Sequence, residues 1–139
     1  MEIKILFTVM SMLFLQACYP IIKTIQPELE IKVIDENGQI IQDAKVTLHT
    51  EIKPAKVDLK DNVKFTNAEG MVNFELLSKI KVENILIHGV QHYDWTLCIS
   101  KNGYQTQESI QINKNENSES KIFILKQGRY SNRLFADSC

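Results

Sequence analysis

The chain has 139 residues, of which 44% are hydrophobic and 24% are charged, and its formal net charge is −1 at pH 7. This length accommodates one ordinary domain, and the composition is that of a globular protein rather than a low-complexity chain. A net charge so close to zero excludes the strongly basic surface with which proteins recruit nucleic acid. We therefore expect one globular domain with no nucleic-acid partner.

An apolar run without a charge occupies residues 5–15, directly after Lys4. As a helix this run spans about 16 Å, whereas a bilayer core requires about 20 residues. A basic residue followed by a short apolar segment is typical of a secretory signal peptide. We expect residues 1–17 to be such a peptide, removed by cleavage after Ala17.

The residues at that cleavage site are Leu15-Gln16-Ala17-Cys18. They resemble the bacterial lipobox, in which a small residue precedes a cysteine whose thiol accepts diacylglycerol and whose freed amine accepts a further acyl chain. Two or three acyl chains hold a protein stably on a membrane. The resemblance implies a cell-envelope lipoprotein anchored through Cys18, and Tyr19 after the cysteine implies the periplasmic face of the outer membrane in a Gram-negative cell. The alternative is ordinary secretory cleavage, which leaves Cys18 as a plain thiol.

Cys98 and Cys139 are then an even pair in an oxidising compartment, where disulfides form. Cys98 lies in the alternating stretch 95–100, on the more polar face opposite Trp95, where a returning C-terminal tail can reach it. We expect a Cys98–Cys139 disulfide. The alternative is a buried thiol at position 98 and a free thiol at the terminus.

From residue 28 onward, apolar and polar residues mostly alternate with period two, which is typical of half-buried strands. The strand candidates, in chain order, are residues 29–33, 44–48, 63–65, 72–76, 84–88, 94–100, 110–112 and 122–125. Turn-forming residues separate them, of which Asn102-Gly103 is the strongest hairpin signal. The one helical candidate is residues 76–82.

This pattern predicts an all-β protein, a single seven- to eight-stranded β-sandwich of the transthyretin or immunoglobulin-like type. We expect residues 18–27 to be a lipid-anchored tether, 28–128 the β-sandwich domain and 129–139 a C-terminal tail.

Three groups of residues lie within this domain: Val33-x-Asp35-x-x-Gly38-x-x-Ile41-x-x-Ala44-x-Val46, Thr66-Asn67-x-x-Gly70-x-x-x-Phe74 and Lys101-x-Gly103-Tyr104. They resemble the carboxypeptidase regulatory-like domain, a transthyretin-like β-sandwich, over residues 29–112. The resemblance implies turns at the glycines and core positions for the apolar residues. The chain departs from the family at Ile40, where proline is common, and at Asp43, where glycine is common. Such domains serve as accessory, adhesion or ligand-binding modules, so the resemblance indicates a fold rather than an activity.

The sequence contains no nucleophile motif, phosphate-binding loop or paired-carboxylate spacing, so we expect no enzymatic activity, no catalytic residue and no cofactor. Two histidines and a carboxylate lie within residues 88–94, but we interpret them as loop residues rather than as a zinc site. We likewise interpret the polar residues 113–120 as a solvated hairpin rather than a calcium loop. Tyr93 and Trp95 share one face and are a candidate ligand platform, with core packing as the alternative.

The features together predict a non-enzymatic envelope lipoprotein that binds another envelope protein or stabilises an envelope assembly. Two alternatives stay open. One is a glycan- or small-ligand-binding module that uses Tyr93 and Trp95, and the other is a periplasmic inhibitor or immunity lipoprotein that neutralises a toxin.

Overall fold

The computed structural model describes residues 18–84, 91–112 and 120–128, and in these residues the backbone forms strands and no helix. The expected all-β class is therefore confirmed. None of the described segments is a helix that could cross a bilayer. The described part of the chain has ten strands rather than the seven or eight expected.

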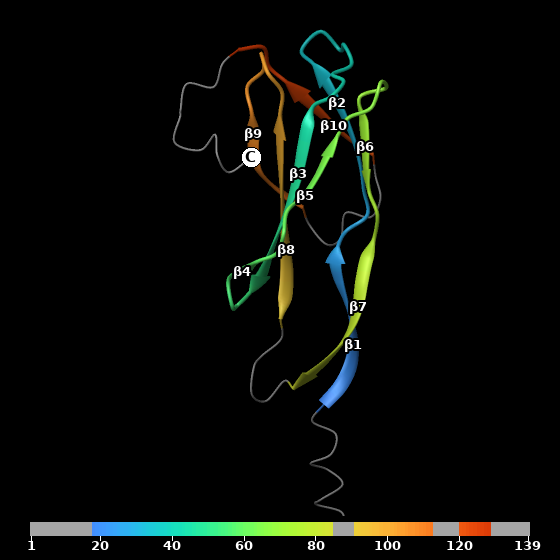
Figure 1. Ribbon diagram of the computed structural model, residues 1–139, viewed down its shortest axis with the longest axis vertical. Helices are drawn as coiled ribbons and strands as arrows, with labels where there is room; N and C mark the ends of the chain where they lie inside the picture. The colour runs from blue at the N-terminus through green and yellow to red at the C-terminus, as the bar shows by residue number, and fades with distance from the viewer. Residues whose placement is uncertain (1–17, 85–90, 113–119, 129–139) are drawn as a thin grey trace, which may run out of the picture.

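The strands form three sheets (Figure 1). Their bounds are β1 Cys18–Gln26, β2 Leu29–Asp35, β3 Lys45–Lys53, β4 Val57–Asp58, β5 Asn62–Phe65, β6 Met71–Phe74, β7 Leu77–Asn84, β8 His92–Ser100, β9 Gln107–Ile112 and β10 Lys121–Leu125. The largest sheet has the order β4-β3-β8-β9, with β5 also paired to β3. A second sheet has the order β10-β2-β6, in which β10 runs parallel to β2 and β6 antiparallel to it. The third sheet is the antiparallel pair of β1 and β7.

One apolar core lies between the two larger sheets, as in a β-sandwich. The strands alternate between buried and half-buried residues, as β2 does along its whole length. Side chains one residue apart on a strand point to opposite faces, so each sheet contributes one face to the core. The buried apolar residues are Leu29, Ile31, Val33, Ile41, Ala44, Val46, Leu48, Val72, Phe74, Tyr93, Trp95, Leu97, Ile99, Ile112 and Leu125.

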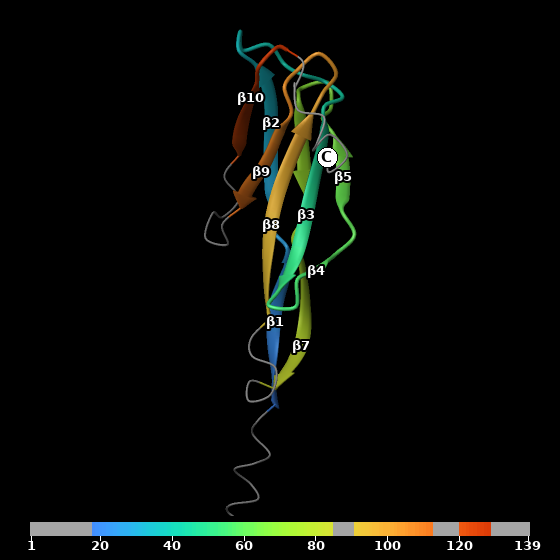
Figure 2. The ribbon, with the colours of Figure 1, turned by 90° about the vertical axis from the view of Figure 1, so that its left-hand side faces the viewer.

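The β1–β7 pair is the continuation of β2 and β6 beyond the core, and both views show it extending past one end of the larger sheets (Figure 2). Leu29 pairs with Phe74, and three residues further along Gln26 pairs with Leu77. The offset is the same on both sides of the gap, so the two ladders form one long antiparallel ribbon. The interruption falls at Pro27, which has no N–H to donate to a ladder.

The buried side chain of Gln26 spans this interruption. Its Nε2 donates a hydrogen bond of 2.7 Å to the Glu75 carbonyl oxygen, opposite the gap. Its Oε1 accepts one of 2.8 Å from Asn62 Nδ2, on the edge strand β5 of the other sheet. The Gln26 amide therefore holds the ribbon continuous and also ties it to the second layer.

Two expectations about these strands are wrong. Residues 18–27, expected to be a tether, contain the nine-residue strand β1. Residues 76–82, the helical candidate, lie largely in β7. The predicted signal peptide, residues 1–17, and the predicted tail, residues 129–139, lie outside the described residues.

The glycines of the three turn motifs have positive φ, at Gly38, Gly70 and Gly103, as expected of turn positions. Gly70 is the most constrained of them. A Cβ at this position would lie 2.8 Å from the Val33 carbonyl oxygen, because that strand passes directly beside the turn. The Gly70 carbonyl oxygen itself accepts a hydrogen bond of 2.8 Å from the Val33 N–H, so the turn and β2 are joined.

Replacing Gln26 by alanine tests the bridge across the interrupted ladder. Gln26→Ala removes both hydrogen bonds of a buried side chain, to Glu75 and to Asn62, and we expect the free energy of unfolding to fall by about 1–3 kcal/mol. The control is Gln111→Ala, because the exposed Gln111 makes only a 3.3 Å hydrogen bond to Thr96 Oγ1 and its loss should cost less than about 0.5 kcal/mol. Urea denaturation measures both values, and equal losses would contradict the bridging role.

Candidate functional site

The proposed ligand platform lies in the protein core. Tyr93 is 8% exposed and Trp95 is 3% exposed, and both side chains pack in the core between the sheets. The indole Nε1 of Trp95 donates a hydrogen bond of 2.7 Å to the Ile25 carbonyl oxygen on β1. A buried indole needs such a partner, so Trp95 fastens the ribbon to the large sheet rather than offering a face to a ligand.

The structure describes two of the three cysteines, Cys18 and Cys98. Cys18 is the first residue of β1. Cys98 is buried on β8, beside its cross-strand neighbour Thr47, on the face of the large sheet that points away from the core. Cys139 lies outside the described residues, so the Cys98–Cys139 disulfide stays a prediction. Ala17 also lies outside them.

The histidine-rich segment contributes no metal site in the described part of the chain. Asp94 accepts a hydrogen bond of 2.5 Å from Lys53 Nζ on the neighbouring strand, and His92 lies exposed at the start of β8. His88 and residues 113–119 lie outside the described residues. Among the described side chains, no three His, Cys, Asp or Glu residues are grouped as metal ligands.

An open hollow of about 700 Å³ lies at one end of the large sheet. Three strands meet there, at Lys45 on β3, Phe65 on β5 and Ser100 on β8, which are neighbours in the sheet. Its wall continues over the turn 101–104, which contributes Lys101 and Tyr104, and over Asp43 and Gly128. The Phe65 ring is 60% exposed. The hollow thus combines an exposed aromatic ring with side chains of both charges.

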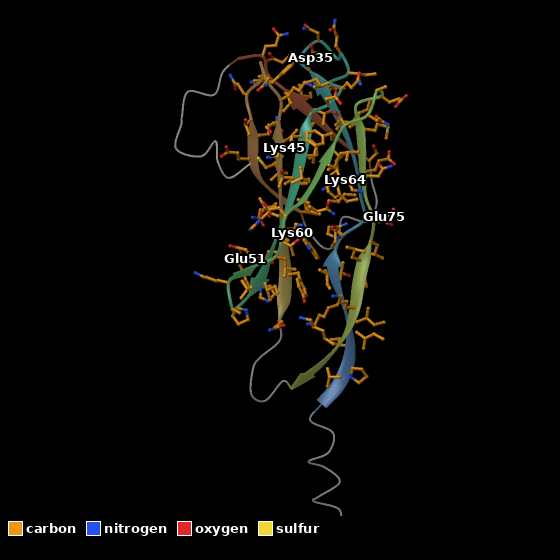
Figure 3. All side chains as sticks on the ribbon, in the orientation of Figure 1. Asp35, Lys45, Glu51, Lys60, Lys64 and Glu75 are labelled. Atoms are coloured by element: carbon orange, nitrogen blue, oxygen red, sulfur yellow. The ribbon has the colours of Figure 1, made fainter. Side chains whose placement is uncertain are left out.

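The hollow and Cys18 lie at opposite ends of the molecule. Lys45 pairs with Ser100 at the hollow, whereas the far ends of the same two strands pair Lys53 with His92. Next to His92, the Gln91 carbonyl oxygen accepts a hydrogen bond of 2.5 Å from Lys23 of β1. Figure 3 shows Lys45 and Glu51 in this order along β3, toward the β1–β7 end.

A histidine on the outer face of the large sheet lies between two carboxylates. Nδ1 of His49 lies 2.7 Å from Oδ1 of Asp61, and Nε2 lies 3.3 Å from Oδ1 of Asp58. A protonated imidazole has two donors and can serve both acids, whereas the neutral ring has one. The hydrogen bond that His49 donates to the Asp61 carboxylate raises the pKa of His49 above its ordinary value, although partial burial opposes the shift.

The raised pKa of His49 means that the two carboxylates stabilise the protonated form of its ring. The stabilisation is complete below the ordinary pKa of about 6.5 and is lost as the pH rises through the higher folded value. Because the side chains are about 40% exposed or more, solvent screens the ion pairs and their contribution is small. This cluster is not apparent from the sequence, because Asp58 in β4 and Asp61 before β5 lie in a segment without a clear strand pattern, and only the fold brings them to His49.

No family model matches the chain, and none of the curated proteins matches it.

We expect Asp61→Asn to lower the pKa of His49, because the substitution removes the charge on its closest partner. Titration of the His49 Hε1 resonance by NMR measures this value. Asp43→Asn is the matched control, since Asp43 lies at the hollow, and should leave the His49 titration in place. An unchanged midpoint in Asp61→Asn would show that the carboxylate does not hold the proton.

Proposed function

We propose that this protein is a lipid-anchored, non-enzymatic component of the bacterial cell envelope, and that its β-sandwich binds a protein partner at the hollow. The anchor is the acylated Cys18 at one end of the molecule. The observation that carries the proposal is the two-ended geometry, in which the hollow lies at the end opposite Cys18. A protein held at its first residue presents its far end to partners in the surrounding space.

The position of β1 supports anchoring at Cys18. Cys18 is the first residue of β1. Acyl chains on Cys18 would join the membrane directly to a strand that is hydrogen-bonded along its length to β7.

The chemistry of the hollow supports a protein partner. An exposed aromatic ring flanked by lysine and aspartate side chains suits a partner segment that offers an apolar group and charges of either sign. Phe65 lies at the end of β5, a short edge strand whose one described ladder partner is β3. An edge strand can also pair with an extended segment of another chain.

Two local features support the transthyretin-like, carboxypeptidase regulatory-like type of sandwich. Asp43 has a φ of 54°, in the left-handed region that favours glycine, and glycine is common in the family at this position. The buried Thr66 hydroxyl joins two loop segments of the motif, since it donates to the Ile41 carbonyl oxygen at 2.7 Å and accepts from the Ala44 N–H at 2.9 Å.

The glycan- or small-ligand-binding alternative has less support, because Tyr93 and Trp95, on which it depended, are buried. The inhibitor or immunity alternative uses the same anchor and the same kind of interface. The identity of the protein partner distinguishes an inhibitor from a structural component. A toxin as the partner would indicate an inhibitor, and a resident envelope protein would indicate a component of an assembly.

In-cell crosslinking of the tagged full-length protein, followed by mass spectrometry, tests the proposal. We expect one protein partner in stoichiometric amount, with capture reduced at least about fivefold in Phe65→Ala, because loss of the ring removes a central contact of the interface. We expect Cys18→Ser to abolish capture and to remove the protein from the membrane fraction.

Val63→Ala is the matched control for the hollow. Val63 is an exposed residue of the same strand and lies outside the lining of the hollow. Capture should therefore persist in Val63→Ala. Equal loss in both variants would contradict binding at the hollow, and membrane retention of a non-acylated Cys18→Ser protein would contradict the anchor.

A further inference from the structure

The outward face of the β1–β7 ribbon carries an apolar patch. Ile22 pairs with Ile80 across the two strands, and Pro20 pairs with Val82. The three branched side chains are 70% or more exposed, at 72% for Ile22, 73% for Ile80 and 70% for Val82, and Pro20 is exposed as well. We call these four residues the ribbon patch. Isoleucine and valine with so much exposed surface normally mark a contact site.

The contacts of the ribbon show that the patch faces away from the sandwich. Lys23 donates a hydrogen bond to the Gln91 carbonyl oxygen, so the odd-numbered residues of β1 before the irregularity at Thr24–Gln26 face the large sheet. On β7, the Lys81 ammonium group lies 5.3 Å from the centre of the Tyr93 ring, also toward that sheet. Because side chains alternate along a strand, the patch residues point the opposite way.

The ribbon also differs in charge from the rest of the chain. β1 and β7 together contain three lysines, Lys23, Lys79 and Lys81, and one acidic residue, Glu83, whereas the whole chain has a net charge of −1. Lys79 is exposed. These lysines lie on the face of the ribbon opposite the patch, and they give the ribbon a net positive charge that attracts it to a bilayer containing anionic lipids.

We propose that the ribbon patch lies in the membrane interface and forms a second, non-covalent contact beside the acylated Cys18. This inference rests on the lipid anchor of the proposed function. The chain length argues for a lipid occupant, because Pro20 is two residues from Cys18 on the same strand and Ile22 only four, about 13 Å at the usual rise of a strand. No flexible spacer separates them, so acyl chains inserted at Cys18 bring the patch to the bilayer.

Contact of the ribbon patch with lipid would fix the orientation of the domain relative to the bilayer, which acyl chains on Cys18 alone would not do. The patch residues lie on both strands of the ribbon, so their contact with lipid presses one face of the ribbon to the bilayer. The hollow, at the opposite end of the sandwich, then points away from the membrane surface. Lipid contact by the patch would therefore hold the proposed partner site in an accessible position.

Fluorescence quenching by lipids with brominated acyl chains tests this contact. The full-length protein, purified from membranes, is placed in phosphatidylethanolamine–phosphatidylglycerol vesicles as Ile80→Trp or, for control, Val63→Trp on the opposite outer face. Trp95 is the single native tryptophan and gives a common background from the core. We expect the added emission in Ile80→Trp to fall by about half or more, since interfacial residues reach about 5–10 Å into the bilayer, and the emission in Val63→Trp to stay unquenched.

The intact mass of the same samples shows whether Cys18 is acylated, and this distinguishes failure of the ribbon contact from failure of the lipid anchor. Acylated protein with an unquenched Ile80→Trp would overturn the ribbon contact and leave the anchor standing, and so would equal quenching of both variants. Protein without acyl chains would overturn both proposals. A dimer by light scattering in detergent, abolished by Ile22→Ser/Ile80→Ser, would assign the patch to a second copy instead. Ile22→Trp is a second reporter on the paired strand should Ile80→Trp fold poorly.

Discussion

The hydrogen-bonded ribbon made by β1–β2 and β6–β7 is the constraint on which the rest of the arrangement depends. One half of it, β2 and β6, contributes Leu29, Ile31 and Phe74 to the core. The other half continues past the end of the sandwich, with one irregularity in the register between Thr24 and Gln26. In a hydrogen-bonded pair of strands, each residue pair determines where the next pair lies, so the position of one end of the ribbon determines the position of the other. The location of Cys18 is therefore set by the packing of the core.

Polar contacts at the interruption keep the two halves in line. Pro27 breaks the ladder, and the Gln26 amide replaces the missing link with bonds to Glu75 and Asn62. The Trp95 indole adds a bond to Ile25 from the opposite sheet. These contacts join the ribbon to both layers, so the ribbon is held as a part of the domain and does not behave as a spacer. A lipid at Cys18 would accordingly act on the orientation of the whole molecule.

The sequence predicts a strand correctly where one face of that strand is buried in the core and the other face is exposed to solvent. Leu29, Ile31 and Val33 alternate with charged or half-buried residues, and this period-two pattern identified β2 as it identified most of the other core strands. β1 was missed because it contains Pro20, is followed by Pro27 and has apolar residues on both faces. β7 was missed because its isoleucine and valine point outward while its lysines face the sandwich, the reverse of the usual pattern.

The candidate sites were predictable only where they depend on local sequence. The residues that resemble a lipobox are contiguous, so Cys18 could be singled out as a candidate without a fold. The hollow joins residues from segments as distant as Asp43 and Gly128, and the His49 cluster depends on where the chain returns after β3. Tyr93 and Trp95 were correctly placed together on one face, but period two alone does not say whether that face is buried.

Hydrogen–deuterium exchange of the full-length protein measures most directly whether Cys18, the residue proposed to carry the lipid, belongs to the folded domain. If β1 is paired to β7 as described, peptides covering residues 21–25 and 78–82 should exchange at least about 100-fold more slowly than unstructured peptides. Exchange of residues 21–25 at the rate of a free peptide, while β3 and β8 stay protected, would show that the segment is a tether after all.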